Sequence, residues 1–256
     1  MHRPLSSEGP SSPLEVGVLG ITGKMGQALR IICEENPHYT LVGGWSRSAP
    51  SSSKNFTDPR HVFEKAQVII DVSHASCVID HVKMAAQHQK PLLVCVTGFE
   101  DDPVHLLKPL ASTAPLLYAA NTSLGIALLK KIVYHVASHL GHEAEITITD
   151  RHHQHKKDAP SGTAKMLAEA VRQGRTSCIE NTSQEGVSEL LPITMTSWRE
   201  GEVFGDHEVT FVTHNERLVL SHQALSREVF AEGALRLGGW LVHQQSGFYT
   251  IDDVYS

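Results

Sequence analysis

The residues best suited to chemistry stand together in one polar stretch, Asp150–Thr163, which reads DRHHQHKKDAPSGT. Imidazoles beside a lysine can donate protons near neutral pH, which suits reduction of an imine or enamine. Ser161–Thr163 predicts a helix start, where backbone N–H groups and two hydroxyls form a seat for an anion. The stretch therefore predicts a proton-donating site for a carboxylate-bearing substrate.

Two other interpretations of this stretch remain open. His152, His153 and His155 could ligate a metal, although no nearby thiolate or HExxH pattern supports one. The stretch could also be a solvated basic turn. If it binds an anion, we expect a cationic pocket built from Arg151, His152, His153, His155, Lys156 and Lys157.

A glycine turn, Gly20–Gly26, reads GITGKMG and stands between an apolar run and a helical pattern. A dinucleotide pyrophosphate docks at such a turn: Gly20 permits chain reversal, Gly23 allows close approach of the backbone, and Gly26 lets the helix pack on the strand. The spacing is GxxGxxG rather than GxGxxG, because Thr22 occupies the middle slot. The alternative is a tight strand-to-helix turn that binds no ligand.

The segment after the second expected strand indicates which dinucleotide binds. An acid there would hold a ribose 2′-hydroxyl, but the chain has Trp45-Ser46-Arg47-Ser48. Arg47 and the serines suit a 2′-phosphate, because a guanidinium pairs bidentately with phosphate oxygens. We therefore expect NADPH to be preferred and NADH to be possible, unless Arg47 is an ordinary loop charge.

Composition limits the class of protein. The chain has 256 residues, 41% hydrophobic and 20% charged, which is typical of a globular protein. A formal net charge of −6 argues against a general nucleic-acid binder or acidic-membrane binder. No apolar run is long enough to span a membrane, and the four cysteines are scattered. We expect a soluble, cytoplasmic protein with reduced thiols and a disordered leader at 1–13.

The elements that position these residues alternate between strand and helix in the first half of the chain. The expected order is strand Leu14–Leu19, helix Met25–Cys33, strand Thr40–Trp45, strand Gln67–Val72, helix Cys77–Gln89, strand Leu92–Val96, helix Pro103–Ser112 and strand Pro115–Ala119. This alternation predicts a doubly wound parallel sheet. We expect His81 and His88 on a solvated helix face, and a marginal cofactor contact from His74.

After Asn121 the pattern changes to a long helix followed by polar turns and short strands. The expected elements are helix Leu124–Leu140, strand Ala144–Thr149, helix Gly162–Gln173, strands Ile193–Ser197, His207–Thr213 and Arg217–Gln223, and helix Arg227–His243. The fold class is therefore α/β: an N-terminal doubly wound Rossmann-type dinucleotide-binding domain, then an α+β domain with a mixed, largely antiparallel sheet. His207 is expected to be a structural turn residue.

Five blocks in the chain carry a resemblance to a known family. They are GITGKMGQ at Gly20–Gln27, VTGF at Val96–Phe99, AANTSLG at Ala119–Gly125, HHQHKKDAPSGTA at His152–Ala164 and WREGEVFGDHEV at Trp198–Val209. In these blocks and in their order the chain resembles the dihydrodipicolinate reductase (4-hydroxy-tetrahydrodipicolinate reductase) family of lysine and diaminopimelate biosynthesis. The resemblance implies NAD(P)H-dependent reduction of 4-hydroxy-tetrahydrodipicolinate, a small dicarboxylate, to tetrahydrodipicolinate by a homotetramer.

The resemblance also implies roles for particular residues. His152 resembles the general acid of the family and Lys156 the second proton donor. The implied substrate-binding residues are His153, Ser161, Gly162 and Thr163, with Thr97 from the other domain. The implied cofactor-binding residues are Gly20, Gly23, Lys24, Met25, Gly26, Arg47, Thr97, Gly98, Ala120 and Asn121, and no metal ligand is expected. The implied domains are a dinucleotide-binding domain at 14–122, completed by 228–256, and a substrate-binding and oligomerisation domain at 123–227.

The chain departs from the family pattern at three places. Asp150 stands where Glu is commoner, with little expected consequence, and Ser46 replaces an acid after the second strand, which favours NADPH. Cys95-Val96-Thr97-Gly98 replaces a frequent GTTG.

Two other functions are compatible with parts of the sequence. A non-catalytic dinucleotide-sensing regulator would not need Lys156 or the Ser161–Thr163 seat. An oxidoreductase could act on another small carboxylate, such as a 2-oxo acid or a semialdehyde. A semialdehyde dehydrogenase would need a nucleophilic cysteine, and no cysteine here has a cationic setting.

Overall fold

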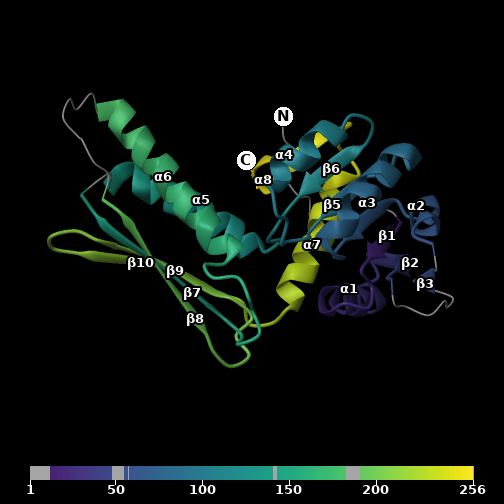
Figure 1. Ribbon diagram of the computed structural model, residues 1–256, viewed down its shortest axis with the longest axis horizontal. Coiled ribbons are helices and arrows are strands. Elements are labelled where there is room, and N and C mark those ends of the chain that lie inside the picture. The colour runs from purple at the N-terminus through teal and green to yellow at the C-terminus, as the bar shows by residue number, and fades with distance from the viewer. Residues whose placement is uncertain (1–11, 48–54, 57, 141–142, 183–190, 256) are drawn as a thin grey trace. The chain divides into compact units, whose positions relative to one another are not determined.

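The computed structural model describes residues 12–47, 55–56, 58–140, 143–182 and 191–255 (Figure 1). The chain divides into two compact units, Met1–Ser123 with Arg227–Ser256 and Leu124–Ser226. Apart from Ser12 and Pro13, the expected leader at 1–13 lies outside the described residues. Within the described part of the chain, every helix is too short or too polar to cross a membrane.

The first unit contains a seven-stranded sheet in which all neighbouring strands run parallel. The order is β11-β6-β5-β4-β1-β2-β3, formed by β1 (Leu14–Leu19), β2 (Tyr39–Trp45), β3 (Asn55–Phe56), β4 (Val68–Asp71), β5 (Leu92–Val94), β6 (Pro115–Tyr118) and β11 (Gly247–Thr250). The helices are α1 (Lys24–Glu35), α2 (Arg60–Lys65), α3 (Ala75–His88), α4 (Pro103–Leu107) with a 3₁₀ turn at Lys108–Leu110, α7 (Glu228–Leu241) and α8 (Ile251–Tyr255).

Alternate side chains of the buried strands pack on opposite faces of this sheet. Val18 of β1 belongs to a core with Leu29 of α1 and Leu237 of α7. Its neighbour Leu19 belongs to a second core with Val62 of α2, and α3 packs there too. Because both faces are covered by helices, the strands are apolar throughout, as in doubly wound sheets. The predicted Rossmann-type fold class is confirmed.

The C-terminal segment packs within the first unit. The Thr122 hydroxyl donates a hydrogen bond to the Phe230 carbonyl, and a Cβ at Gly233 of α7 would lie 1.9 Å from the Thr122 carbonyl oxygen. This contact requires glycine, because any side chain would push α7 away. The following strand β11, which the sequence patterns did not predict, extends the sheet beside β6.

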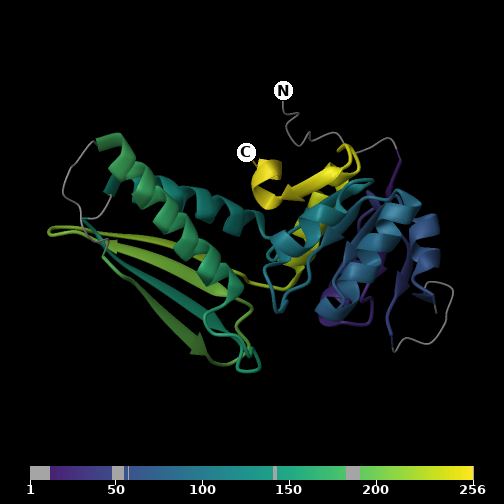
Figure 2. The ribbon, with the colours of Figure 1, turned by 45° about the horizontal axis from the view of Figure 1, so that its top comes forward.

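The second unit contains a four-stranded sheet of order β10-β9-β7-β8 and two long helices. Its elements are α5 (Leu124–Leu140), β7 (Glu145–His152), α6 (Gly162–Thr182), β8 (Ile193–Arg199), β9 (Asp206–Val212) and β10 (Arg217–Gln223). Only β7 and β8 are parallel, so the predicted mixed, largely antiparallel sheet is confirmed. Figure 2 shows α5 and α6 on one face of the sheet, where Val133 and Leu167 form a core with Phe211 of β9.

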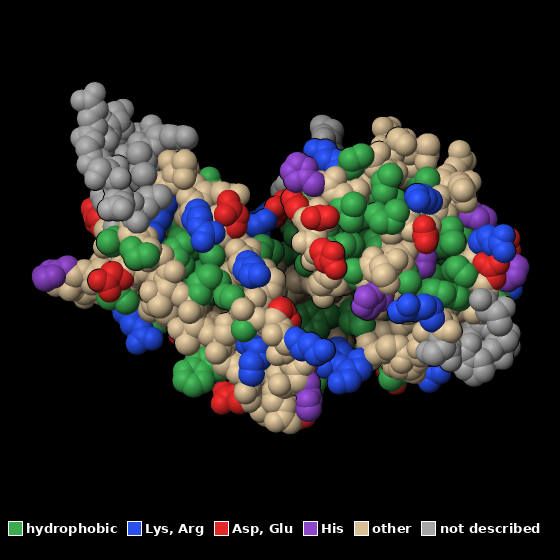
Figure 3. Space-filling view, viewed as in Figure 1, with side chains coloured by type: hydrophobic (Ala, Val, Ile, Leu, Met, Phe, Trp, Pro, Cys, Tyr) green, Lys and Arg blue, Asp and Glu red, His purple; other side chains and the backbone are tan. Residues whose placement is uncertain are grey.

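The charges of the first unit are spread rather than gathered. On its face in Figure 3, Asp and Glu side chains are interspersed with Lys and Arg. Some of these charges form local pairs, such as Asp58 with Arg60 and Asp80 with Lys83. This face therefore offers an anionic ligand local arrangements of donors rather than a general basic surface.

The prediction that His81 lies on a solvated helix face was wrong. His81 is buried, with 2% of its surface exposed, and its Nδ1 lies 2.7 Å from Oδ2 of the buried Asp71. Asp71 also accepts a hydrogen bond from the Ser73 backbone N–H at the end of β4. His88, one face-repeat further along α3, is half-buried and stacks on Phe63. Helical periodicity alone did not reveal that His81 is more buried than His88, because the partner of His81 lies on a strand.

We predict that His81→Ala lowers the free energy of unfolding by about 3 kcal/mol, because it removes one partner of a buried pair and leaves the Asp71 carboxylate without that donor. His88→Ala, the matched control, should cost about 1 kcal/mol or less, since only a partly exposed ring contact is lost. Urea denaturation followed by circular dichroism measures both. Equal losses in the two variants would contradict the importance of the buried pair.

Candidate functional site

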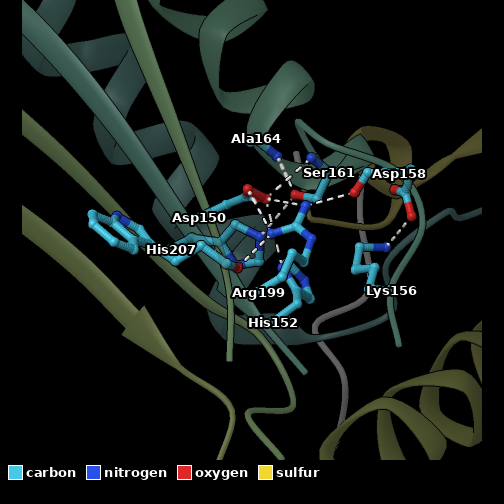
Figure 4. Close-up of polar contacts among 9 residues, drawn as sticks. Asp150, His152, Lys156, Asp158, Ser161, Ala164, Arg199 and His207 are labelled. Atoms are coloured by element: carbon cyan, nitrogen blue, oxygen red, sulfur yellow. Dashed lines mark hydrogen bonds and ion pairs between the residues drawn. The ribbon is translucent and has the colours of Figure 1, made fainter. Parts of the chain in front are cut away.

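The candidate site of the second unit is built around the carboxylate of Asp150 near the end of β7 (Figure 4). Asp150 is fully buried and accepts hydrogen bonds from both terminal nitrogens of Arg199, at 3.3 and 3.2 Å, and from the Ser161 backbone N–H at 3.1 Å. Burial would raise the pKa of Asp150, but hydrogen bonds from Ser197, Arg199 and Ser161 outweigh it, so the pKa is lowered. This carboxylate joins β7, β8 and the start of α6.

Strand β7 is longer than predicted and this changes which residues enter the site. It runs to His152 because Asp150–His152 pair with Ser197–Arg199 of β8. Since side chains alternate along a strand, Asp150 and His152 are buried on one face and Arg151 is exposed on the other. The expected cationic pocket is therefore wrong in including Arg151. The guanidinium in the site comes from Arg199 instead, which belongs to the WREGEVFGDHEV block but was given no role from the sequence.

His152 is a buried, neutral imidazole in this arrangement. Its Nδ1 lies 3.6 Å from Oδ2 of Asp150, and its ring meets the His207 ring edge-on, with centroids 5.1 Å apart. Burial, and next the positive charge of Lys156, lower the pKa of His152 to about 4. The group implied as general acid by the family resemblance therefore lacks its proton at neutral pH unless a bound anion restores it.

The segment after β7 holds Lys156 beside a second carboxylate. Its Nζ lies 2.8 Å from Oδ1 of Asp158, and the Lys156 backbone N–H donates to the His153 carbonyl. The His153 backbone N–H in turn donates to the Val203 carbonyl at 2.8 Å. The exposed His155 and Lys157 lie on the same segment. Asp158 thus pairs with Lys156, as Asp150 pairs with Arg199.

Helix α6 starts at this site, as the sequence predicts. Ser161 precedes the helix, and its Oγ accepts a hydrogen bond from the Ala164 N–H at 3.1 Å, as an N-cap does. Gly162 is exposed, and apart from its chain neighbours and the backbone of its own helix, no atom of the described residues lies within 4 Å of the position that its Cβ would take. Thr163 follows, half-buried, in the first turn. The helix start therefore offers N–H groups and open space to an anion.

Two further residues line the site, and sequence analysis did not assign either of them to it. His207 is buried in β9, with its Nε2 3.2 Å from the Ser161 Oγ, so the expectation of a turn residue was wrong. Gly205 has φ +152°, and a Cβ there would lie 3.2 Å from Nε2 of His152. Both belong to the WREGEVFGDHEV block, which was the available signal.

The histidines of this stretch do not converge on a metal position. Across the described ranges, no three His, Cys, Asp or Glu side chains are grouped so that they could hold a metal ion. His152 is buried in the site, whereas His155 is exposed.

A second candidate site lies in the first unit, at the carboxyl ends of its strands. A cavity of about 220 Å³ is lined by Gly20, Thr22, Gly23, Trp45, Ser46, Arg47, Val72, Ser73, His74 and Cys77. Gly20 has φ +90°, and the Thr22 and Ser46 hydroxyls are hydrogen-bonded at 2.7 Å. The Gly23 backbone and the Arg47 guanidinium border the same cavity. Both are groups of the kind that bind the phosphates of a dinucleotide.

The other residues predicted to bind the cofactor occupy different positions. Lys24 is exposed at the start of α1, Met25 packs against the core and Gly26 is buried. Thr97 and Gly98 follow β5 and are exposed. Ala120 and Asn121 follow β6, the next strand in the sheet. These last four do not line the cavity, but they stand at the same carboxyl edge, about 10–15 Å along the sheet from β1 at normal strand spacing.

Comparison with known proteins identifies the family. Residues 14–122 match the family model for the N-terminus of dihydrodipicolinate reductase, and residues 125–255 match the model for its C-terminus. The chain belongs to the dihydrodipicolinate reductase family. The 4-hydroxy-tetrahydrodipicolinate reductase of Zymomonas mobilis is 36% identical over 249 residues, covering 95% of this chain and 97% of that protein. That of Helicobacter hepaticus is 36% identical over 251 residues, covering 94% and 98%.

Solved structures agree with the fold. The dipicolinate-bound dihydrodipicolinate reductase from Paenisporosarcina sp. TG-14 has a TM-score of 0.72 at 21% identity, covering 93% of this chain and 97% of that one. The C. glutamicum DAP dehydrogenase in complex with DAP has a TM-score of 0.55 at 14% identity, covering 94% and 93%. At these identities the likeness shows the fold alone.

Proposed function

We propose that this protein catalyses the NAD(P)H-dependent reduction of 4-hydroxy-tetrahydrodipicolinate to tetrahydrodipicolinate, a step of diaminopimelate and lysine biosynthesis in which the ring gains a hydride and a proton and loses its 4-hydroxyl group as water. The observation that carries the proposal is the grouping of His152 and Lys156 beside the Ser161 helix start, in a chain whose relatives bear this name over nearly their whole length. Neither a dinucleotide-sensing regulator nor another oxidoreductase is favoured by a comparable observation.

The substrate carboxylates bind, in this proposal, at the start of α6. Ser161, Gly162 and Thr163 supply hydroxyl and N–H donors, and His153 and Thr97 contribute further contacts. The exposed Gly162 leaves room for a carboxylate to approach the backbone closely. Binding both carboxylates fixes the orientation of the ring, which is the protein's main contribution to a reaction of this type.

Lys156 and His152 supply the proton. The Lys156 ammonium, paired with Asp158, is the donor present before substrate binds. His152 gains a proton when a dianionic ligand approaches, because a nearby opposite charge favours the imidazolium. Gly205 keeps the space beside His152 Nε2 open for that exchange.

The cavity of the first unit holds the dinucleotide in this proposal. Gly20, Gly23, Lys24, Met25 and Gly26 form the turn at the pyrophosphate. Arg47 binds the 2′-phosphate, so NADPH is preferred and NADH is accepted. The nicotinamide end lies along Thr97, Gly98, Ala120 and Asn121. When bound, the reduced nicotinamide supplies the hydride.

We further propose a homotetrameric, cytoplasmic enzyme. Helices cover one face of the four-stranded sheet, and the opposite face exposes Thr194, Trp198 and Val219, which suits packing against another copy. Light scattering that gave the 28.0 kDa mass of one chain would contradict this assembly. Cys33, Cys77 and Cys95 are free thiols, which suits a reducing compartment.

The function is tested by NADPH oxidation, followed at the nicotinamide absorbance, with freshly condensed dicarboxylate substrate. Oxidation should require that substrate, and Lys156→Met should lower kcat by about 100-fold or more, since a positioned proton donor contributes that much. NADPH affinity should be unchanged. Lys157→Met, which removes the exposed neighbouring charge, is the control. No turnover by the wild-type protein would overturn the proposed function, and turnover only with 2-oxo acids would favour the alternative oxidoreductase.

The pKa of His152 predicts proton uptake on ligand binding. Near pH 6.5 the imidazole, with its pKa of about 4, is neutral, and a bound dicarboxylate raises the pKa towards or above that pH. Dipicolinate binding should therefore take up a substantial fraction of one proton, measured by calorimetry in buffers of different ionisation enthalpy. His152→Gln should abolish the uptake and His155→Gln should retain it. Uptake of equal size in both variants would assign the proton to another group.

Arg47→Ala should weaken NADPH binding by about 10- to 100-fold and leave NADH binding unchanged, because the charged hydrogen bonds to a 2′-phosphate are lost. Arg30→Ala, on the exposed face of α1, is the matched control for loss of an arginine near this turn. Fluorescence titration of both dinucleotides gives the dissociation constants. Equal weakening for NADPH and NADH would remove the 2′-phosphate role.

A further inference from the structure

The hydroxyl of Ser161 has two partners inside the protein. Its Oγ accepts a hydrogen bond from the Ala164 N–H at 3.1 Å, and Nε2 of His207 lies 3.2 Å from the same oxygen. Ser161 is 1% exposed and His207 3%, so protein groups, rather than bulk water, are the main hydrogen-bond partners of both side chains. The direction of the second hydrogen bond therefore decides which way the Ser161 hydrogen points.

The surroundings of His207 settle that direction. Burial, and next the nearby His152, lower the pKa of His207 to about 3, so the imidazole is neutral with one ring N–H. Nδ1 of His207 is buried and has no hydrogen-bond partner among the residues that the structure describes. A proton on Nδ1 would be a buried N–H with no acceptor, which is rare, whereas an unpaired lone pair is better tolerated. The proton therefore resides on Nε2 and is donated to the Ser161 Oγ.

A serine hydroxyl has one donor hydrogen and two acceptor lone pairs. In Ser161 both lone pairs are engaged, by the Ala164 N–H and by His207, so the hydroxyl is left with its hydrogen alone. A carboxylate is an acceptor without donors and matches such a group.

We propose that His207 is a positioning residue that makes the Ser161 hydroxyl an obligatory donor to a substrate carboxylate. This role rests on the proposed function, since it needs an anionic ligand at the start of α6. It extends that function by assigning part of the selectivity for carboxylates to a side chain that touches Ser161 and not the ligand.

His207 also packs edge-on against His152, so a purely structural role must be distinguished from this one. A double-mutant cycle does so. His207→Leu keeps an apolar side chain in place but removes the ring nitrogens, and Ser161→Ala removes the hydroxyl through which His207 would act. If His207 acts through Ser161, the effects of the two substitutions on ligand affinity are coupled. If His207 only packs against its neighbours, the two effects add.

The measurement is dipicolinate affinity by calorimetry, with NADPH bound at saturation, for the wild type, both single variants and the double variant. His207→Leu should weaken dipicolinate binding by about tenfold or more, and in the Ser161→Ala background it should add little or nothing. Wild-type affinity in His207→Leu, or a full added loss in the Ser161→Ala background, would overturn the role.

Two further variants complete the test. His207→Gln carries an amide N–H that can reach the position of Nε2, so it should restore much of the affinity. This variant keeps the test valid if His207→Leu folds poorly. No recovery of affinity in a folded His207→Gln would count against the role. His222→Leu removes the imidazole opposite His207 in the β9–β10 pair and should bind dipicolinate like the wild type. A wild-type protein that binds no dicarboxylate overturns the proposed function together with this role, whereas normal wild-type turnover with an unchanged His207→Leu overturns this role alone.

Discussion

The buried carboxylate of Asp150 is the interaction on which the second unit's site depends. It joins three segments far apart in the chain: the end of β7, Arg199 on β8 and the Ser161 N–H that precedes α6. A buried carboxylate with its donors in place is held firmly, because removing any one donor leaves charge without compensation. The positions of His152 and of the α6 start are consequences of this one anchor.

The same anchor explains how an anion site can exist in a protein of net charge −6. The positive groups are already paired: Arg199 with Asp150, and Lys156 with Asp158. A cluster of unpaired cations would be costly to bury, whereas paired ones keep donors in fixed directions. In the proposed function, the site therefore recognises an anion mainly through oriented N–H and O–H donors at a helix start. The site also contains the neutral imidazole of His152, which can become charged when a ligand supplies the opposite charge.

Much of the fold was predictable, and the failures have a common physical cause. Apolar runs followed by glycines or polar turns predicted the parallel strands. The Asp150–Thr163 stretch predicted the position of the candidate site. The errors concern side chains whose partners lie on another element: His81 of α3 contacts Asp71 of β4, and His207 of β9 contacts Ser161, which precedes α6. Periodicity within one element describes a face, but not what covers it. The end of β7 was missed for the same reason, since it is set by pairing with β8.

The glycine turn shows how structure separates constraints that sequence spacing mixes. A Cβ at Gly26 would lie 2.3 Å from the Gly20 carbonyl oxygen, and Gly20 itself has φ +90°, so the fold requires both glycines whether or not a ligand binds. Gly23 is different, because it is exposed and a Cβ there would meet only the Gly20 carbonyl, at 3.3 Å. Packing therefore constrains Gly23 less than Gly20 or Gly26, and in the proposed function its glycine also allows a ligand to approach the backbone closely. Thr22 is tolerated in the middle slot because its side chain is exposed and bonds to Ser46 at the cavity wall.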